Sequence, residues 1–285
     1  MVSRLSLENV SYSYPLQGTG MALRGISLDA RPGEVLCVAG SNGSGKSTLA
    51  QVCAGLLAPT SGSVLYDGKP VGSGVRLRKL HRKVGLLFQS PEDQLFADTV
   101  RKDIEFGPRN QGLRGDELAG RVDEASTLVG LSLEETGGRS PFSLSEGEKR
   151  RVALAGVLAM SPEVLVLDEP FIGLDRDGRE HLIGALSSYL NRKRATVIVV
   201  THDLSGTWPL ADRFALLSEG RLLVIESKAD LMSGEADMLA LGVQLPQWGV
   251  LARELLHAGI ALEDPSDPSC LAKALARRRE VEDGR

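Results

Sequence analysis

The stretch Gly40-Ser41-Asn42-Gly43-Ser44-Gly45-Lys46-Ser47 decides the fold of this chain. It fits G-x-x-x-x-G-K-[ST], a pattern in which glycines let backbone N–H groups turn inward and approach phosphate oxygens closely. The run 34–39 before it predicts a buried strand, and residues 48–53 after it predict a helix, which is the context that the motif needs. Lys46 could then reach the β- and γ-phosphates of a nucleotide, and Ser47 could hold Mg²⁺.

The alternative is a glycine-rich turn that matches by accident, expected about once in a hundred chains of this length. The strand and helix predicted on either side disfavour it, so the sequence predicts a site for a nucleotide with Mg²⁺. The residues expected to contact the nucleotide here are Gly40, Ser41, Asn42, Gly43, Ser44, Gly45, Lys46, Ser47 and Thr48.

The composition limits which classes of protein this chain can belong to. The 285 residues are 42% hydrophobic and 25% charged, which is ordinary for a soluble globular chain of one large and one small domain. A net charge of −4 and an aromatic content of 4% argue against nucleic acid as a partner. No apolar run approaches the roughly 18 residues that span a bilayer, and the N-terminus lacks an apolar signal core. We therefore expect a cytosolic protein whose membrane role, if any, comes through a partner.

The pattern along the chain predicts an α/β fold around the phosphate loop. Residues 5–12 alternate apolar and polar side chains, as a half-exposed strand does, and residues 116–129 form a charge-rich helical stretch. The apolar runs 164–167 and 196–200 suit central parallel strands covered on both faces. Further strands are expected at 63–66 and 84–88, with a closing hairpin at 213–217 and 221–225 around Glu219-Gly220 and a break at about 233–235.

Two carboxylates end the strand at 164–167. An acid at a strand end beside a phosphate loop can hold Mg²⁺, a role that fits Asp168, and Glu169 could then activate the attacking water. An exposed acidic turn is the alternative, but a phosphate loop about 120 residues upstream favours the functional interpretation.

Two other polar residues follow predicted central strands. His202 could hydrogen-bond a γ-phosphate or the attacking water, because ligands gather at strand C-termini in open α/β sheets. A structural histidine is the alternative. Gln89 could contact Mg²⁺ or the water through its amide, although the sequence alone does not reject an ordinary surface glutamine.

A polar segment, residues 142–151, precedes the apolar helix expected at 152–160. Ser143 or Ser145 could cap that helix, with acidic residues following in its first turn. Composition does not choose between a capped helix alone and a second phosphate site at the helix N-terminus.

With these motifs in order, residues 1–232 resemble an ATP-binding-cassette (ABC) ATPase. Residues 144–148, LSEGE, resemble the family signature LSGGQ. The resemblance implies that Ser145 and Gly147 of one subunit contact the γ-phosphate bound to the other subunit. It also implies an adenine-stacking role for Tyr14, the Q-loop glutamine for Gln89, the switch histidine for His202, the Walker B pair for Asp168 and Glu169, and the D-loop aspartate for Asp175.

A narrower resemblance, to the ATPases of energy-coupling factor transporters, is carried by residues 88–100 and 104–108 and by the tail from 245 to 260. It implies ATP and Mg²⁺ as cofactors and a dimer at the cytoplasmic face of the membrane, either homomeric or of two paralogues. That dimer drives a membrane T component, which serves an S component for a transition metal or vitamin. We expect an ATPase domain at 1–234 with an antiparallel β subdomain and a helical insert at about 90–160, and a dimerising helical extension at 235–285.

The chain departs from the family pattern at three positions. Glu146 replaces the first signature glycine, Glu148 replaces the glutamine, and Phe171 replaces a commoner threonine. Glu146 adds negative charge near polyphosphate, which could slow closure unless the side chain turns outward. A soluble cassette ATPase for DNA repair or translation remains the rival from another class, and a degenerate regulatory subunit is a third hypothesis.

Two apolar features remain. Gln94, Leu95 and Phe96 are expected near a groove for a membrane partner, with local packing as the alternative. In the tail, positions 248, 251, 252, 255 and 256 have the spacing of an amphipathic helix. Its apolar face could dock on its own domain, but the resemblance favours contact between two tails, so we expect the tail to hold the nucleotide-free dimer together.

Overall fold

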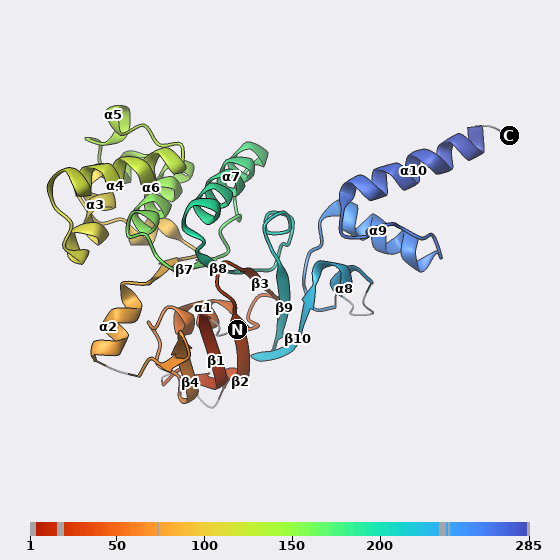
Figure 1. Cartoon of the computed structure of the whole chain (residues 1–285), viewed down its shortest axis with the longest axis horizontal. Helices are drawn as coiled ribbons and strands as arrows, with labels where there is room; N and C mark the ends of the chain where they lie inside the picture. Colours follow the sequence, from red (N-terminus) through yellow and green to blue (C-terminus); the bar gives the residue numbers. More distant parts are fainter. Residues whose placement is uncertain (1–3, 16–19, 73, 234–237, 239, 284–285) are drawn as a thin grey trace.

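The chain contains two β-sheets, a helical insert, a C-terminal group of helices and further helices between the strands, described in a computed structural model over residues 4–15, 20–72, 74–233, 238 and 240–283 (Figure 1). The larger sheet has six strands in the order β10-β9-β3-β8-β7-β6. Its strands are β3 (Val35–Ala39), β6 (Val84–Leu87), β7 (Val164–Asp168), β8 (Thr196–Thr201), β9 (Arg213–Ser218) and β10 (Arg221–Ser227). All pair in parallel except β10, which pairs antiparallel with β9.

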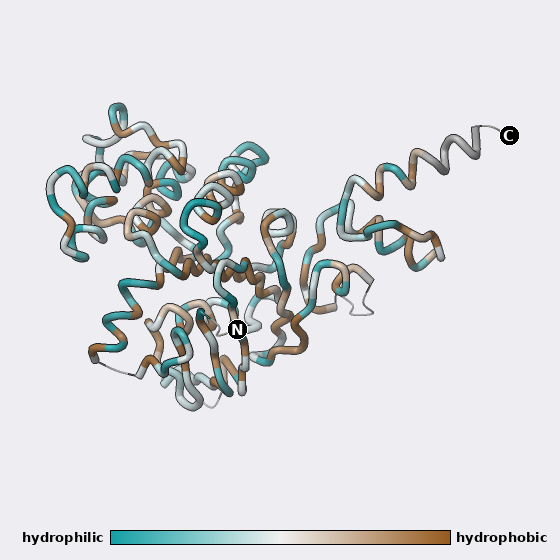
Figure 2. The backbone as a smooth tube through the Cα atoms, in the orientation of Figure 1, coloured by the Kyte–Doolittle hydropathy of each residue, from teal (hydrophilic) through white to brown (hydrophobic). Residues whose placement is uncertain are grey.

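The central strands are apolar on both faces because each face is covered. Leu36 and Val38 pack with α1 (Lys46–Cys53) and the smaller sheet, whereas Val35 and Cys37 pack with the helical insert, α7 (Arg176–Lys193) and the tail. Figure 2 shows the most hydrophobic stretches of backbone in the middle of the molecule, where these strands lie. The continuous apolar runs at β7 and β8 are thus explained by burial between two layers.

The smaller sheet is antiparallel, in the order β2-β1-β4-β5, and confirms the predicted antiparallel subdomain. Its strands are β1 (Leu5–Ser13), β2 (Met21–Ala30), β4 (Ser61–Tyr66) and β5 (Lys69–Pro70). Strand β2 was not predicted from the sequence, since the two consecutive exposed residues Arg24 and Gly25 interrupt the alternation along that strand. The helix α2 (Val75–His81) then leads back to β6.

The helical insert packs on one face of the larger sheet and extends away from it, at the upper left of Figure 1. It contains η1 (Pro91–Gln94), α3 (Val100–Gln111), α4 (Gly115–Leu128), α5 (Leu133–Thr136), η2 (Pro141–Ser143) and α6 (Glu146–Ala159). The helix α6 contacts both α3 and α4 and carries seven buried residues, so it forms the centre of the insert. The predicted helix at 116–129 corresponds to α4, and the helix predicted at 152–160 starts earlier, at Glu146.

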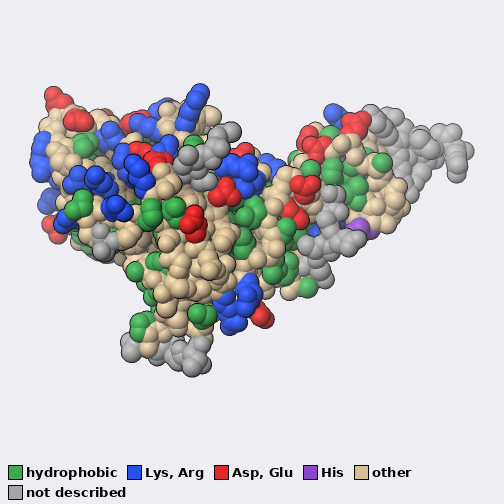
Figure 3. All heavy atoms as spheres, turned by 60° about the horizontal axis from the view of Figure 1, so that its bottom comes forward, with side chains coloured by type: hydrophobic (Ala, Val, Ile, Leu, Met, Phe, Trp, Pro, Cys, Tyr) green, Lys and Arg blue, Asp and Glu red, His purple; other side chains and the backbone are tan. Residues whose placement is uncertain are grey.

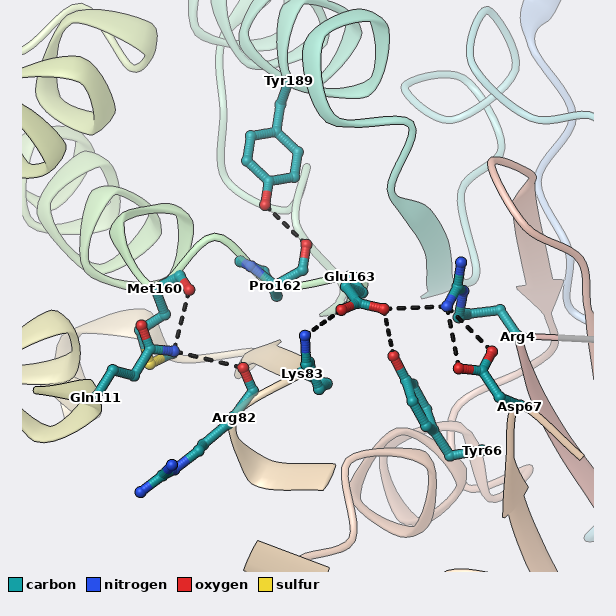
Figure 4. A network of polar contacts seen from close by, with 10 residues as sticks. All are labelled: Arg4, Tyr66, Asp67, Arg82, Lys83, Gln111, Met160, Pro162, Glu163 and Tyr189. Carbon is teal, nitrogen blue, oxygen red and sulfur yellow. Dashed lines mark hydrogen bonds and ion pairs between the residues drawn. The ribbon is translucent and has the colours of Figure 1, made fainter. Parts of the chain in front are cut away.

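A polar network joins the subdomains at the sheet edge where β6 and β7 begin (Figure 4). The guanidinium of Arg4 lies 3.0 Å from carboxylate oxygens of both Asp67 and Glu163, and Lys83 also pairs with Glu163. Burial alone would raise the pKa of Glu163, but hydrogen bonds from Lys83 and Tyr66 outweigh it and lower that pKa. The network therefore ties the antiparallel sheet to the parallel one.

Residues beyond β10 form α8 (Lys228–Ser233), α9 (Gln247–His257) and α10 (Pro268–Asp283). The predicted amphipathic helix corresponds to α9. Part of its apolar face packs on the same chain: Ala252 is buried, and Trp248 lies edge-on to Trp208 with ring centroids 5.5 Å apart. Most of the predicted break at 233–235 lies outside the described residues. None of the helices among the described residues is long and apolar enough to cross a membrane.

Candidate nucleotide site

The carboxyl ends of four parallel strands bring the predicted site residues to one edge of the larger sheet. The phosphate loop follows β3, Glu169 follows β7 and His202 follows β8. Gln89 comes two residues after β6, which ends at Leu87 rather than at Phe88. Because parallel strands end at the same edge, residues as far apart in sequence as Gly40 and His202, 162 positions, lie at one edge of the sheet.

The conformation of the phosphate loop requires glycine at two positions. Gly45 has φ +106°, and a Cβ atom there would lie 2.5 Å from the carbonyl oxygen of Ala22. A Cβ atom on Gly40 would lie 2.2 Å from the carbonyl oxygen of Leu217. Strands β2 and β9 thus approach the loop too closely for any side chain, which fixes the position of its backbone N–H groups.

A cavity of about 590 Å³ lies above this loop and includes Tyr14 on its wall. The hydroxyls of Tyr14 and Thr48 lie 3.1 Å apart, and the ring of Tyr14 stands edge-on to that of Tyr12 at 5.0 Å. The cavity is thus lined by both the polar phosphate loop and an aromatic ring. Its lining residues are Tyr14, Gly20, Met21, Ala22, Asn42, Gly43, Gly45, Lys46, Ser47, Thr48, Gln89 and Glu169.

Glu169 is the centre of a buried polar cluster. Its carboxylate accepts hydrogen bonds from the Thr201 hydroxyl at 2.7 Å and from the His202 backbone N–H at 3.1 Å, and its Oε1 lies 2.9 Å from the Nδ1 atom of His202. The ammonium of Lys46, 3.6 Å from Glu169 Oε1, also donates to the carbonyl oxygens of Gly40 and Ser41 at 2.8 and 2.9 Å. The cluster fixes the orientation of one carboxylate at the wall of the cavity.

Asp168 has the properties of a cation ligand. Its Oδ1 is buried and makes no hydrogen bond with any residue that the structure describes. Burial raises its pKa, and the hydrogen bond with Ser47 and the charge of Lys46 offset this only in part. Asp168, Ser47 and Gln89 line a second cavity of about 540 Å³. These oxygen donors fit Mg²⁺, which would compensate the buried charge of Asp168.

The signature residues lie elsewhere. Ser145 is the N-cap of α6, and it forms a capping box with Glu148, whose carboxylate accepts hydrogen bonds from the backbone N–H and the hydroxyl of Ser145. Gly147 and Asp175 line a separate cavity of about 470 Å³ between α6 and α7, which none of the phosphate-loop residues borders. Within one chain, the signature and the phosphate loop therefore border two separate cavities.

Sequence reasoning missed two residues that support the site. Thr201 is 2% exposed, and its hydroxyl donates to the Glu169 carboxylate. Its position directly before His202 was the feature of the sequence that could have indicated this role. Arg150 donates to the carbonyl oxygens of Pro170 and Ile172 at 2.8 and 2.6 Å, and so links the signature helix to the segment after Glu169. No sequence motif marks a contact of that kind.

This combination of a phosphate loop, strand-end carboxylates and a capped signature helix defines the class of ABC-type P-loop ATPases. The sequence profile of the ABC transporter family matches residues 23–172. An energy-coupling factor transporter ATP-binding protein of Clostridium perfringens is 38% identical over 91% of this chain and 92% of its own length. The corresponding protein of Symbiobacterium thermophilum is 42% identical over 98% and 96%.

Solved structures agree. The chain is similar to cbiO1 of Clostridium perfringens, part of the cbiONQ ABC transporter complex, with a TM-score of 0.74 and 36% identity over 88% of this chain and 99% of that one. A dimeric ATP-binding cassette bound to ADP and phosphate matches with a TM-score of 0.71 and 29% identity over 78% and 98%. The chain belongs to the ABC transporter family and is an ATPase subunit of the energy-coupling factor type. The predicted family, fold class and ATPase activity are confirmed.

Proposed function

We propose that two such ATPase subunits work as a pair at the cytoplasmic face of the membrane and power an importer. The partners in this proposal are a membrane T component and, through it, an S component that binds a transition metal ion or a vitamin. The relationship to cbiO1, itself part of a transporter complex, supports the proposal. The observation that carries it is the separation of the phosphate loop from the signature within one chain, which leaves each half-site to be completed by a second subunit.

Within the site, ATP would lie in the cavity beside Tyr14, with its phosphates on the glycine loop and Lys46. Ser47, Asp168 and Gln89 would hold Mg²⁺, which neutralises phosphate charge. Glu169 would accept a proton from the attacking water, and the hydrogen bonds from Thr201 and His202 hold its carboxylate in place for that purpose. His202 would also contact the γ-phosphate or the water.

The second half-site would close over this ATP from the partner subunit. Ser145 and Gly147 lie exposed at the N-terminal end of α6, where backbone N–H groups favour anions. Asp175 caps α7, accepting from the N–H of Gly178 at 2.8 Å. A dimeric relative with bound ADP and phosphate supports this pairing.

The coupling surface proposed for the T component begins after the Q-loop. Phe96 is 56% exposed and stacks edge-on with Phe106, which is 49% exposed, at a centroid distance of 4.6 Å. Leu95, in contrast, is buried, which supports local packing for Leu95 and leaves Phe96 as the exposed residue for the proposed surface. Gln94 is also structural, because its amide donates to the carbonyl of Leu86 and accepts from the N–H of Phe88.

Purification of the tagged chain from membranes of its source cells in mild detergent tests the proposal. We expect a hydrophobic membrane protein to co-purify and to be lost with Phe96→Asp, whereas ATP binding persists. Val75→Asp is the matched control, since Val75 is 59% exposed on α2, outside the insert. Retention of the membrane partner by Phe96→Asp would refute the coupling surface, and a chain that purifies alone with full ATP turnover would favour a soluble ATPase.

A further inference from the structure

The start of the C-terminal extension touches the segment that carries the switch histidine. Gln244 and Asp203 form a parallel β-bridge. The backbone N–H of Gln244 donates to the carbonyl oxygen of His202 at 2.8 Å, and the N–H of Leu204 donates to the carbonyl oxygen of Gln244 at 2.9 Å. The side chain of Gln244 is exposed, so the contact is made by the backbone alone.

Two residues earlier, the same segment packs against the phosphate loop. Gly242 has φ +66°, and a Cβ atom placed on it would lie 2.6 Å from the Cβ atom and 3.1 Å from the Cα atom of Ser41. Real Cβ contacts are not this short, so a larger residue at 242 would displace either the tail or the loop. Residues 242–244 therefore contact both the phosphate loop and the His202 segment.

The segment is anchored on its far side by the rest of the extension. Val243 is 2% exposed, and its N–H donates to the carbonyl of Met238. Trp248 packs edge-on to Trp208, whose indole N–H donates to the carbonyl of Ser266 at 3.1 Å. The extension thus packs on the rest of the chain through its own hydrophobic contacts, which fix where Gln244 can pair with the segment that follows His202.

His202 is consequently held from two sides. Its backbone N–H donates to the Glu169 carboxylate on the site side, and its carbonyl oxygen accepts from the tail on the other. We propose that residues 242–244 are a positioning element of the ATPase site, which holds His202 against Glu169 and supports the first turn of the phosphate loop. The proposal rests on the catalytic role proposed above for His202, and it makes the rate of hydrolysis depend on the seating of the tail.

The first test is Gly242→Ala in the full chain, with Gly259→Ala as its matched control. Both glycines lie in the extension with positive φ, +66° and +78°, but no atom of the residues that the structure describes lies within 4 Å of a Cβ atom on Gly259. We expect Gly242→Ala to lower kcat by about tenfold, the cost of overpacking at a tight contact, with ATP affinity changed less than kcat. Gly259→Ala should keep the kcat of the parent chain. Equal effects of the two substitutions on kcat would overturn the proposal.

The second test examines whether the effect passes through the proposed contacts. Gln244→Pro removes the N–H that bonds His202, whereas Gln244→Ala keeps it, so kcat should fall only with proline. In a His202→Ala background the further loss of kcat caused by Gln244→Pro should largely vanish, since the group it positions is already gone. An undiminished loss in that background would assign the effect to general destabilisation and overturn the proposal.

These outcomes separate the inference from the proposed function. If His202→Ala itself turns over ATP at the rate of the parent chain, the catalytic role of His202 fails. If His202→Ala is slow while Gly242→Ala and Gln244→Pro are both as fast as the parent, only the positioning role of the tail fails. Circular dichroism melting of each variant identifies any that does not fold. If Gly242→Ala does not fold, the same substitution in a Ser41→Gly background decides whether the contact with the phosphate loop matters. Removing the Ser41 Cβ relieves the 2.6 Å contact and should reduce the loss of kcat.

Discussion

Replacing Glu169 with glutamine tests the proposed chemistry most directly, because the structure shows what the substitution keeps. One carboxylate oxygen of Glu169 faces Lys46 and the N–H and ring of His202, and the other faces the Thr201 hydroxyl. A glutamine with its oxygen toward His202 would keep those hydrogen bonds, and the Thr201 hydroxyl could rotate to accept from the new NH₂ group. Little rearrangement is therefore expected, and the variant loses mainly a base.

The magnitude follows from that loss. A positioned general base contributes about 10²- to 10⁴-fold to a rate, so we expect kcat to fall by roughly a thousandfold. ATP affinity should be kept or should rise, because Lys46 is released from its 3.6 Å ion pair with Glu169 and one negative charge leaves the phosphate site. Slow hydrolysis with intact binding should leave the dimer closed around ATP.

Three measurements check this prediction: phosphate release for kcat, calorimetry for ATP affinity, and size-exclusion chromatography with ATP for the trapped dimer. Glu180→Gln is the control, since Glu180 pairs only with Arg176 on the exposed face of α7 among the contacts that the structure describes. A Glu169→Gln variant within a few-fold of the parent kcat would remove Glu169 as the base. A variant that no longer binds ATP would show that the cluster itself, and not proton transfer, had been lost.

Three further predictions concern other parts of the molecule. Asp168→Asn should raise the melting temperature without Mg²⁺, because it removes a buried carboxylate whose pKa is raised by burial. The same substitution should abolish Mg²⁺-dependent turnover. A lower melting temperature would contradict the argument that Asp168 carries an unpaired buried charge. Glu146→Gly should speed turnover no more than a few-fold, because the Glu146 side chain is exposed, and a severe loss would reveal a positive role for it. Truncation after Gly234 should weaken the nucleotide-free dimer in sedimentation velocity while ATP binding persists, and equal dimer fractions would reject the tail as a dimer clamp.

The last of these predictions depends on the part of the tail that its own chain leaves uncovered. Val250, Leu251 and Leu275 are 47%, 38% and 39% exposed, and Figure 3 shows hydrophobic side chains on the surface of the extension, at the right. Val250 and Leu251 belong to α9, which buries Ala252 against the core, and Leu275 belongs to α10. Docking on the same chain and contact with a second tail would therefore use different residues of the extension, and the first does not exclude the second.

The sequence predicted best where chemistry demands a residue type at a fixed position. The glycines of the phosphate loop, the acid at the end of β7 and the apolar runs of β7 and β8 each had one physical cause, and the structure brings them together at one sheet edge. Strand β2 was missed because its pairing with β1 shifts register at bulges. Such shifts break the alternation of apolar and polar residues by which a strand is predicted. The different burial of Leu95 and Phe96 also could not be read from the sequence, since adjacent residues of similar hydropathy point in opposite directions.

Contacts made by the backbone are the other part that the sequence could not supply. The bridge between Gln244 and the His202 segment uses N–H and carbonyl groups that every non-proline residue carries. Gly242 gave a weak signal, since a glycine tolerates both positive φ and close approach, but a glycine between two leucine-containing segments is equally compatible with an ordinary surface turn. Only the fold shows that this glycine faces the phosphate loop.

The two departures in the signature have different physical meanings. Glu148 occupies the third position of α6, where either glutamate or glutamine completes a capping box, so its exchange for glutamine preserves the structural role. The hydrogen bonds from Ser145 lower the pKa of Glu148, so the side chain remains ionised at neutral pH. In the proposed closed dimer, Ser145 would exchange this carboxylate partner for a phosphate. Glu146 takes no part in that exchange, because the capping box is complete without it. Under the proposed pairing, the charge of Glu148 would therefore affect closure more than that of Glu146, and we expect Glu148→Gln to ease ATP-driven dimerisation more than Glu146→Gly does.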